Sequence, residues 1–211
     1  MPSESFASRI KVARKHIEEL DEGAEGGRIS HKDRRLDLLD QLLREEQREN
    51  RLVEPYVFLS FAGNEGENLI QDVLPAIRRL RVPGGSGTFK VETGMAIRGR
   101  TNVLDHVTER IAPCCIFVGI MTKEHPLDGV KDDEGGTFAP GAWVLLEAGI
   151  ARGLGLEIIF LVENGIHGSF WKNAFGHIRQ AKFDRSNYKP GLDFVCELVL
   201  EHYRELRARS A

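Results

Sequence analysis

From Tyr56 onwards, short β-rich runs alternate with segments of helical pattern, and this alternation limits the possible folds more than any other feature. The runs at 115–120 (CIFVGI) and 157–162 (EIIFLV) are apolar almost throughout, as expected of strands that helices cover on both faces. Further strands are predicted at 56–61, 88–92 and 180–183, and helices near 65–80, 101–112, 142–154, 169–178 and 191–208. The pattern therefore predicts an α/β fold with a doubly wound, flavodoxin-like parallel sheet, in which 56–61 and 115–120 are interior strands.

The first 52 residues differ from the rest in composition, with 11 Lys or Arg and 12 Asp or Glu. Two apolar stripes at helical spacing flank a glycine-rich break at 23–27 and consist of Phe6, Ile10, Ala13, Ile17 and Leu20, then Leu36, Leu39 and Leu43. We expect two helices within 4–50, hence an N-terminal helical hairpin over 1–52 and a main domain over 53–211. The hairpin would cover the main domain or, alternatively, pair with a partner helix or a second copy of the chain.

Composition and charge exclude several classes of protein. With 41% hydrophobic and 29% charged residues the chain should form one substantial core. A net charge of −3 gives no basic field for nucleic acid. Since no apolar run approaches the ~20 residues that span a bilayer, we expect a cytoplasmic protein that binds no membrane. The three cysteines show neither a disulfide framework nor metal-ligand spacing, so no metal site is expected and Cys114 and Cys115 are interpreted as core residues.

Ligands of an open α/β sheet bind beyond the carboxyl ends of its strands. The residues that follow the predicted strands are 60–64, 93–100, 121–123 and 163–165. The loop 94–100 carries two glycines with Arg98 and Arg100, which suit a phosphate, although both arginines could equally be solvated. The connection from Lys123 to Ala142 is long, as binding loops and lids often are.

The segment GAWVLLEAGIARGLG (141–155) is apolar nearly all round as a helix, apart from Glu147 and Arg152. Trp143 lies four residues before Glu147, so the two share a helical face. A carboxylate on an apolar face is costly unless it is paired, bound to ligand or open to a cleft. Glu147 is therefore the first candidate for a functional site, the alternatives being an ion pair with a neighbouring arginine or a position at a solvated rim.

Three motifs occur in the order found in bacterial-type Toll/interleukin-receptor (TIR) domains. They are YVFLSF (56–61), an Arg-Gly pair after the second strand, and the Trp143-to-Glu147 motif WVLLE. Over about 55–205 the chain resembles this family. The resemblance implies that Glu147 is the catalytic glutamate of an NAD-cleaving enzyme, with NAD as substrate and no cofactor, and that Trp143 supports it.

The resemblance also implies a substrate pocket and a cellular role. Ser60, Phe61 and Ala62, at the end of the first strand, would line the pocket, together with Arg98 and Arg100 of a loop that shapes the site. The family further implies self-association and a role in immune or anti-phage defence signalling. The chain departs from the family beside Trp143, where many members carry Ser or Cys and this chain has Gly141, Ala142 and Val144.

Two other functions stay open at the level of sequence. TIR domains also serve as non-catalytic assembly modules. In addition, DDEGGT (132–137) followed by the EAGIA run (147–151) is similar to the motif of nucleoside 2-deoxyribosyltransferases, which attack an N-glycosidic carbon through a glutamate. The spacing differs from that family, because Glu147 lies ten residues after Thr137.

Overall fold

The computed structural model describes residues 51–94, 103–129, 136–176 and 178–210, with the backbone alone at 63–68 and 210. The chain divides after Val53 into two units, and the second, Glu54–Ala211, contains the fold described below. The helical hairpin expected over 1–52 lies, but for its last two residues, outside the described part of the chain and stays a prediction.

Five parallel strands form the central sheet, in the order β2-β1-β3-β6-β7. They are β1 (Tyr56–Phe61), β2 (Lys90–Thr93), β3 (Ile116–Met121), β6 (Glu157–Glu163) and β7 (Arg179–Phe183). Counted along the chain, this is the strand order 2-1-3-4-5 of flavodoxin-like folds. The predicted doubly wound sheet, with β1 and β3 in its interior, is confirmed.

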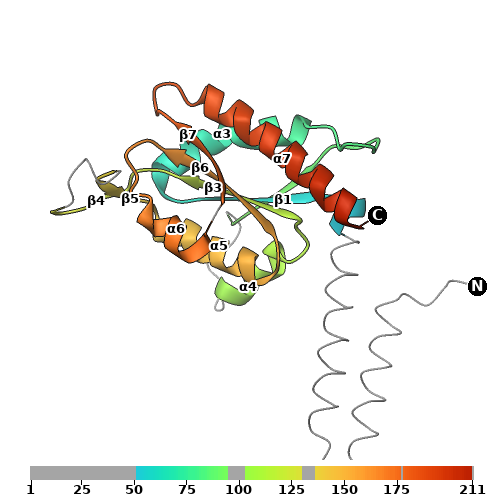
Figure 1. Ribbon diagram of the computed structural model, residues 1–211, viewed down its shortest axis with the longest axis horizontal. Coiled ribbons are helices and arrows are strands. Elements are labelled where there is room, and N and C mark those ends of the chain that lie inside the picture. Colours follow the sequence, from blue (N-terminus) through green and yellow to red (C-terminus); the bar gives the residue numbers. More distant parts are fainter. Residues whose placement is uncertain (1–50, 95–102, 130–135, 177, 211) are drawn as a thin grey trace, which may run out of the picture. The chain divides into compact units, whose positions relative to one another are not determined.

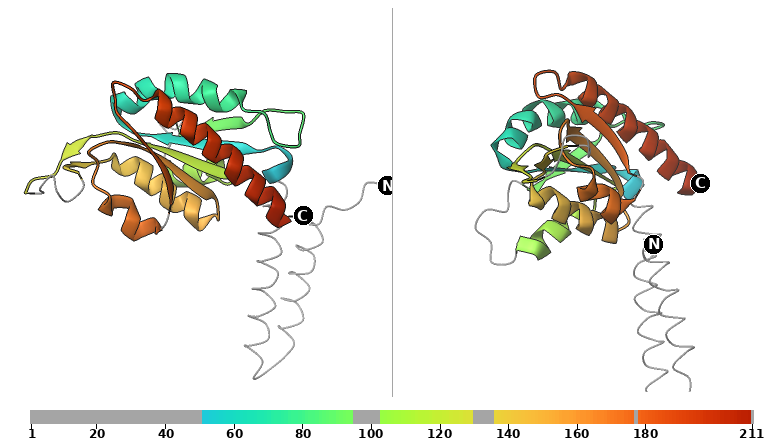
Figure 2. Two further views of the ribbon diagram at one scale, coloured as in Figure 1. Left: turned by 45° about the horizontal axis from the view of Figure 1, so that its top comes forward. Right: turned by 60° about the vertical axis from the view of Figure 1, so that its left-hand side comes forward.

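Helices cover both faces of the sheet, as Figures 1 and 2 show. One face carries α3 (Gly63–Arg79) and α7 (Lys189–Ser210). The other carries α4 (Val103–Ile111), α5 (Ala142–Gly153) and α6 (Ser169–Phe175). Because both faces are covered, all six residues of β3 are buried, which explains its unbroken apolar sequence.

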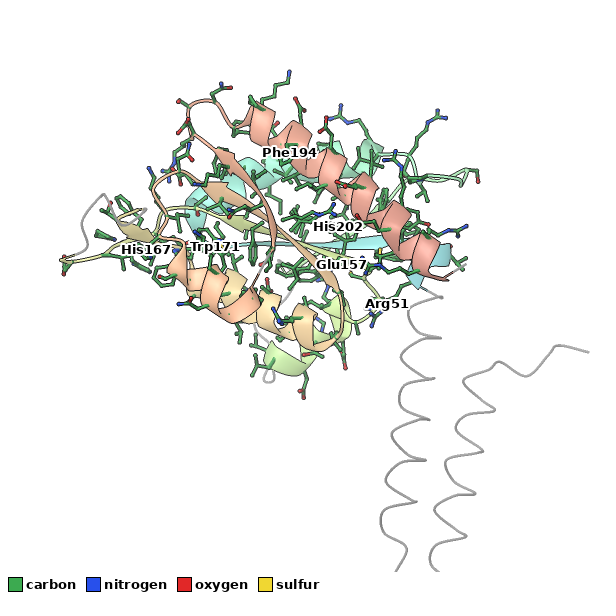
Figure 3. All side chains as sticks on the ribbon, in the orientation of Figure 1. Arg51, Glu157, His167, Trp171, Phe194 and His202 are labelled. Atoms are coloured by element: carbon green, nitrogen blue, oxygen red, sulfur yellow. The ribbon has the colours of Figure 1, made fainter. Side chains whose placement is uncertain are left out.

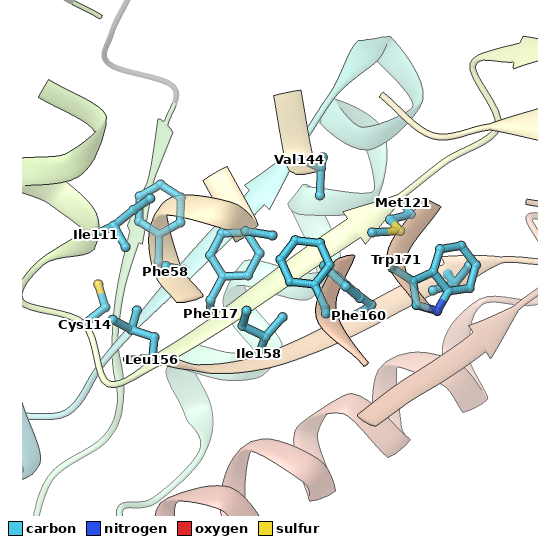
Figure 4. Packing of buried hydrophobic residues seen from close by; sticks show 14 of the residues in the cluster. Phe58, Ile111, Cys114, Phe117, Met121, Val144, Leu156, Ile158, Phe160 and Trp171 are labelled. Atoms are coloured by element: carbon cyan, nitrogen blue, oxygen red, sulfur yellow. The ribbon is translucent and has the colours of Figure 1, made fainter. Parts of the chain in front are cut away.

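Aromatic side chains fill the layer between the sheet and α5 (Figure 4). Phe58 of β1 stacks on Phe117 of β3 with ring centroids 5.9 Å apart, and Phe160 of β6 meets Phe175 of α6 edge to face at 5.7 Å. Such pairs stabilise a core by about 0.5–1.5 kcal/mol beyond the area that they bury. This layer holds the end of β1 and the helix α5 in fixed positions, and both carry residues of the site described below.

The long connection before α5 contains a small hairpin that the sequence did not predict. Strands β4 (His125–Pro126) and β5 (Phe138–Ala139) pair antiparallel and are too short to produce a periodic pattern. The backbone N–H groups of Thr137 and Phe138 both donate to the carbonyl oxygen of Gly165, just beyond β6. The hairpin is thereby tied to the carboxyl edge of the sheet, beside His167 (Figure 3).

Candidate functional site

Glu147 is the buried carboxylate at the centre of the candidate site. Only 1% of the residue is exposed. The other buried residues of α5, such as Val144 and Ala148, are apolar. The hydroxyl of Ser60 donates a hydrogen bond to Oε2, and the indole Nε1–H of Trp143 donates one to Oε1 at 2.8 Å. Among the described residues, therefore, two neutral donors hold this carboxylate, and its burial shows that the expected solvated rim is wrong. The other alternative, an arginine partner, stays untested, because Arg98 and Arg100 lie outside the described residues.

The charge state of Glu147 follows from these surroundings. Burial raises the pKa of its carboxyl from 4.5 to about 7, although the hydrogen bonds from Ser60 and Trp143 act in the opposite direction. Burial dominates because two neutral donors cannot replace the hydration that an anion loses. Near neutral pH the group is thus divided between its acid and its anion, as is common for carboxyls in functional sites.

The site lies where an open α/β sheet of this topology binds ligands. The chain proceeds from β1 to β2 on one side and to β3 on the other, so the strand order reverses between β1 and β3. Ser60 is the penultimate residue of β1 and is paired in register with Gly119 of β3. A crevice between the carboxyl ends of two such strands is the usual ligand position in these folds. The place where the strand order reverses is called the switch point of the sheet. The hydrogen bond from Ser60 places Glu147 at this point.

A glycine on β3 allows α5 to approach this closely. A Cβ atom added to Gly119 would lie 2.9 Å from the side chain of Val144 on α5 and 2.9 Å from that of Phe160. Contacts that short do not occur in real structures, so a larger residue would push the helix away from the sheet. Gly119, the residue opposite Ser60, thus lets α5 lie close enough to the sheet for Glu147 to contact Ser60.

A second glycine marks the crowded beginning of α5. A Cβ atom on Gly141 would lie 2.4 Å from Cβ of Ala62 and 2.7 Å from Oε1 of Glu124. Ala62 follows β1 directly, and Glu124 lies three residues beyond the end of β3. The space beside Gly141 is thus occupied by a carboxylate and a methyl group.

Glu163 forms a third acidic centre at the carboxyl end of β6 and is 2% exposed. Arg185 donates to both its oxygens, at 3.0 and 2.8 Å, and Lys123 contributes its backbone N–H at 2.9 Å and its ammonium group at 3.4 Å. Burial alone would raise the pKa of Glu163, but these donors outweigh it and hold the pKa below its usual value. The cluster joins the ends of β3, β6 and β7 and brings two cations to this edge.

The structure brings together some of the predicted site residues and leaves others undescribed. Glu147, Trp143 and Ser60 are joined directly, while Phe61 and Ala62 are half-buried at the end of β1. Arg98 and Arg100 lie outside the described residues, so their predicted phosphate contacts stay predictions; the preceding Thr93 and Gly94 do lie at the carboxyl end of β2.

Sequence reasoning missed Glu124 and Arg185. Arg185 lies two residues beyond β7, so the rule that was applied to the other strand ends would have found it. Glu124 directly follows 121–123, the residues that were considered at the end of that strand, and no motif in the sequence marks it. Within the described ranges, no group of three His, Cys, Asp or Glu residues could hold a metal ion, and no helix has the length and apolarity to cross a membrane.

Comparison with known proteins leaves the family of the chain open. No model of a protein family matches it, and a search of curated proteins finds no match. Among solved structures it is similar to that of a Clostridium botulinum CMP N-glycosidase, BcmB, with 16% sequence identity and a TM-score of 0.42, over 66% of this chain and 98% of that chain. A similarity at this level decides neither fold nor function, which rest on the geometry above.

Proposed function

We propose that this protein cleaves the N-glycosidic bond of a nucleotide, with Glu147 as the catalytic carboxylate. The observation that carries the proposal is the buried Glu147, held by Ser60 and Trp143 at the switch point of the sheet. When the bond from ribose C1′ to the base nitrogen breaks, positive charge develops on the sugar. An anion fixed beforehand in a dry site stabilises that charge more than water can.

The surroundings of Glu147 favour a substrate that is itself cationic. Burial, Ser60 and Trp143 account for the shift of its pKa, so the described residues supply no counter-charge to the carboxylate. A ribosyl pyridinium such as that of NAD would supply one and would lower the pKa of Glu147 on binding. This supports the finer proposal of NAD cleavage at the nicotinamide–ribose bond.

The chemistry of NAD cleavage also fits a single carboxylate. The electron pair of the breaking bond goes to the ring nitrogen, and nicotinamide leaves as a neutral molecule that needs no general acid. A water molecule then adds through its oxygen to C1′ and loses a proton, which gives ADP-ribose; closure by a group within the nucleotide would instead give a cyclic product. Assembly into oligomers, as the TIR resemblance implies, would be the condition under which this site acts in defence signalling.

Base release from three probes tests the proposal. The full chain is incubated with NAD, with CMP, and with a deoxynucleoside plus a free acceptor base, over a wide range of protein concentrations. We expect nicotinamide release that Glu147→Gln reduces by about 10²- to 10³-fold, the scale of one lost electrostatic contact to a transition state. Base release from CMP alone would keep the class and replace the substrate, and base exchange would favour the deoxyribosyltransferase-like alternative. No turnover at any concentration would leave the non-catalytic assembly module.

A further inference from the structure

Glu124 is a second carboxylate beside the start of the helix that carries Glu147, and the reaction proposed above gives it no role. Its backbone N–H donates to the carbonyl of Ala139 at 3.1 Å, which fixes the residue to the hairpin. Its Oε1 atom is buried, and no described residue forms a hydrogen bond with it. Its Oε2 atom lies 4.0 Å from Nε2 of the exposed His125, beyond hydrogen-bond distance. A buried carboxylate oxygen is costly unless it accepts a hydrogen bond, so Oε1 of Glu124 is suited to accept one from an incoming donor.

The two glutamates lie along the same face of the end of β1. Alternate residues of an extended segment point to one side, so Ser60 and Ala62 both face α5, about 6.5 Å apart. Ser60 binds the carboxylate of Glu147. Ala62 and the Glu124 carboxylate both adjoin the same point, the position that a Cβ of Gly141 would occupy. Glu147 therefore contacts Ser60, and Glu124 adjoins Ala62, two residues further along the same face at the end of β1.

Two side chains beside Glu147 and at the start of α5 are partly exposed. Trp143 is 36% exposed, and the side chain of Glu124 is 22% exposed. The last torsion of a glutamate side chain is broad, so a small rotation of the carboxyl turns its unpaired oxygen toward an incoming group. An ionised carboxylate only accepts hydrogen bonds, so the group that satisfies Glu124 has to be a donor.

We propose that Glu124 accepts hydrogen bonds from the ribose hydroxyls of the substrate and thereby selects ribonucleotides over deoxyribonucleotides. The inference rests on the proposed function, because a ribose with C1′ beside Glu147 and its ring directed along β1 toward Ala62 would carry its 2′- and 3′-hydroxyls toward Glu124. Its two hydroxyls are the donors that the unpaired oxygen lacks. A purely structural Glu124, placed only to favour the start of α5, would be indifferent to these hydroxyls.

Ligand selectivity is the measurement that separates these roles. Binding is measured by titration calorimetry in the Glu147→Gln background, which keeps the ligand intact, for NAD and CMP and for their 2′-deoxy analogues. We expect the ribose form to bind about 10- to 100-fold more tightly, as one or two charge-assisted hydrogen bonds imply. Adding Glu124→Gln should reduce this preference to within about threefold.

Control variants keep the result interpretable. Glu197→Gln makes the same chemical change on an exposed position of α7, on the other face of the sheet, and should leave the selectivity unchanged. Glu124→Asp retains the charge and serves if the glutamine variant folds poorly; its shorter side chain should weaken the ribose preference. If the parent releases base but all variants show the same ribose selectivity, the proposed function stands and only the role of Glu124 is overturned. Failure of both nucleotides to bind would overturn it together with the proposed function.

Discussion

The hydroxyl of Ser60 donates a hydrogen bond to the carboxylate of Glu147, a residue 87 positions further along the chain. The bond joins the end of β1 to α5 across the switch point of the sheet. It has two effects, since it orients the carboxylate and it favours the ionised form against a burial that favours the acid. The fraction of Glu147 that is ionised at neutral pH, and with it the proposed activity, therefore depends on this bond.

Ser60→Ala should shift the pH profile of base release. Without the hydroxyl donor the pKa of Glu147 rises above its value of about 7, because burial is then less opposed. We expect the ascending limb of kcat/KM to move upward by about one to two pH units and the rate at pH 7 to fall about 5- to 50-fold. Trp143→Phe should act in the same direction, since it removes only the indole N–H donor.

The control for this profile is Ser86→Ala, which removes an exposed hydroxyl from the turn before β2. It should leave both the rate and the position of the limb unchanged. A Ser60→Ala profile that falls in height without moving along the pH axis would show that Ser60 acts only on the position of Glu147.

Glu147→Gln should make the protein more stable above neutral pH. Because the folded pKa of Glu147 is raised to about 7 from 4.5, the folded state keeps its proton longer than the unfolded chain. The contribution of this group to stability is therefore present at low pH and lost as pH rises from about 4.5 to 7. Glutamine does not titrate, so the variant does not lose this contribution. Its unfolding free energy relative to the parent should therefore increase by about 3 kcal/mol between these two pH values.

Urea unfolding at pH 5 and pH 8 measures that difference, with Glu197→Gln as the exposed control. A difference in unfolding free energy between parent and Glu147→Gln that is the same at both pH values would contradict the raised pKa.

The fold and the position of Glu147 on an apolar helix could be predicted from sequence, but the residues that Glu147 contacts on other elements could not. Alternation of buried strands and helices is a local pattern, and a lone charge in the apolar helix indicated Glu147. The pairing with Ser60 depends on the register of β1 against β3 and on how closely α5 approaches, which no local pattern contains. The edge strand β2 begins at Lys90 rather than 88, because Thr88 instead forms an isolated antiparallel bridge with Arg81.

Replacing Arg185 tests how much the ion pair of Glu163 at the sheet edge contributes to stability. Arg185→Gln deletes two hydrogen bonds to a carboxylate that stays buried beside Lys123, and we expect a loss of about 1 to 3 kcal/mol in unfolding free energy. Since the pKa of Glu163 is held low, its contribution is present above the unfolded pKa and lost as pH falls through the folded pKa. The variant should accordingly lose less stability on acidification than the parent does.

Arg209→Gln is the matched comparison, because it breaks the ion pairs of Arg209 with Glu157 and Glu205, side chains that are 52%, 27% and 34% exposed. Exposed pairs of this kind contribute about 0–1 kcal/mol. Equal losses in the two arginine variants at neutral pH would mean that Glu163 is not an important link at this edge.

Gly141, which directly precedes α5, and Gly149 within it give a paired test of how the helix is positioned. Gly141→Ala places a methyl group within 2.4 Å of Ala62 and 2.7 Å of Glu124, so the start of the helix has to move away from β1. Gly149→Ala adds the same methyl group where nothing lies within 4 Å, on an exposed turn of the same helix. We expect the first substitution to cost about 1 to 3 kcal/mol through overpacking, and the second to stabilise by about 0.5 to 1 kcal/mol because alanine favours a helix interior.

The two variants should also differ in base release, because a shift of α5 alters the contact of Glu147 with Ser60 whereas an exposed methyl group does not. Thermal unfolding and base release are therefore measured on both, and a Gly141→Ala protein as stable and active as Gly149→Ala would show that the close approach of α5 to β1 is not required.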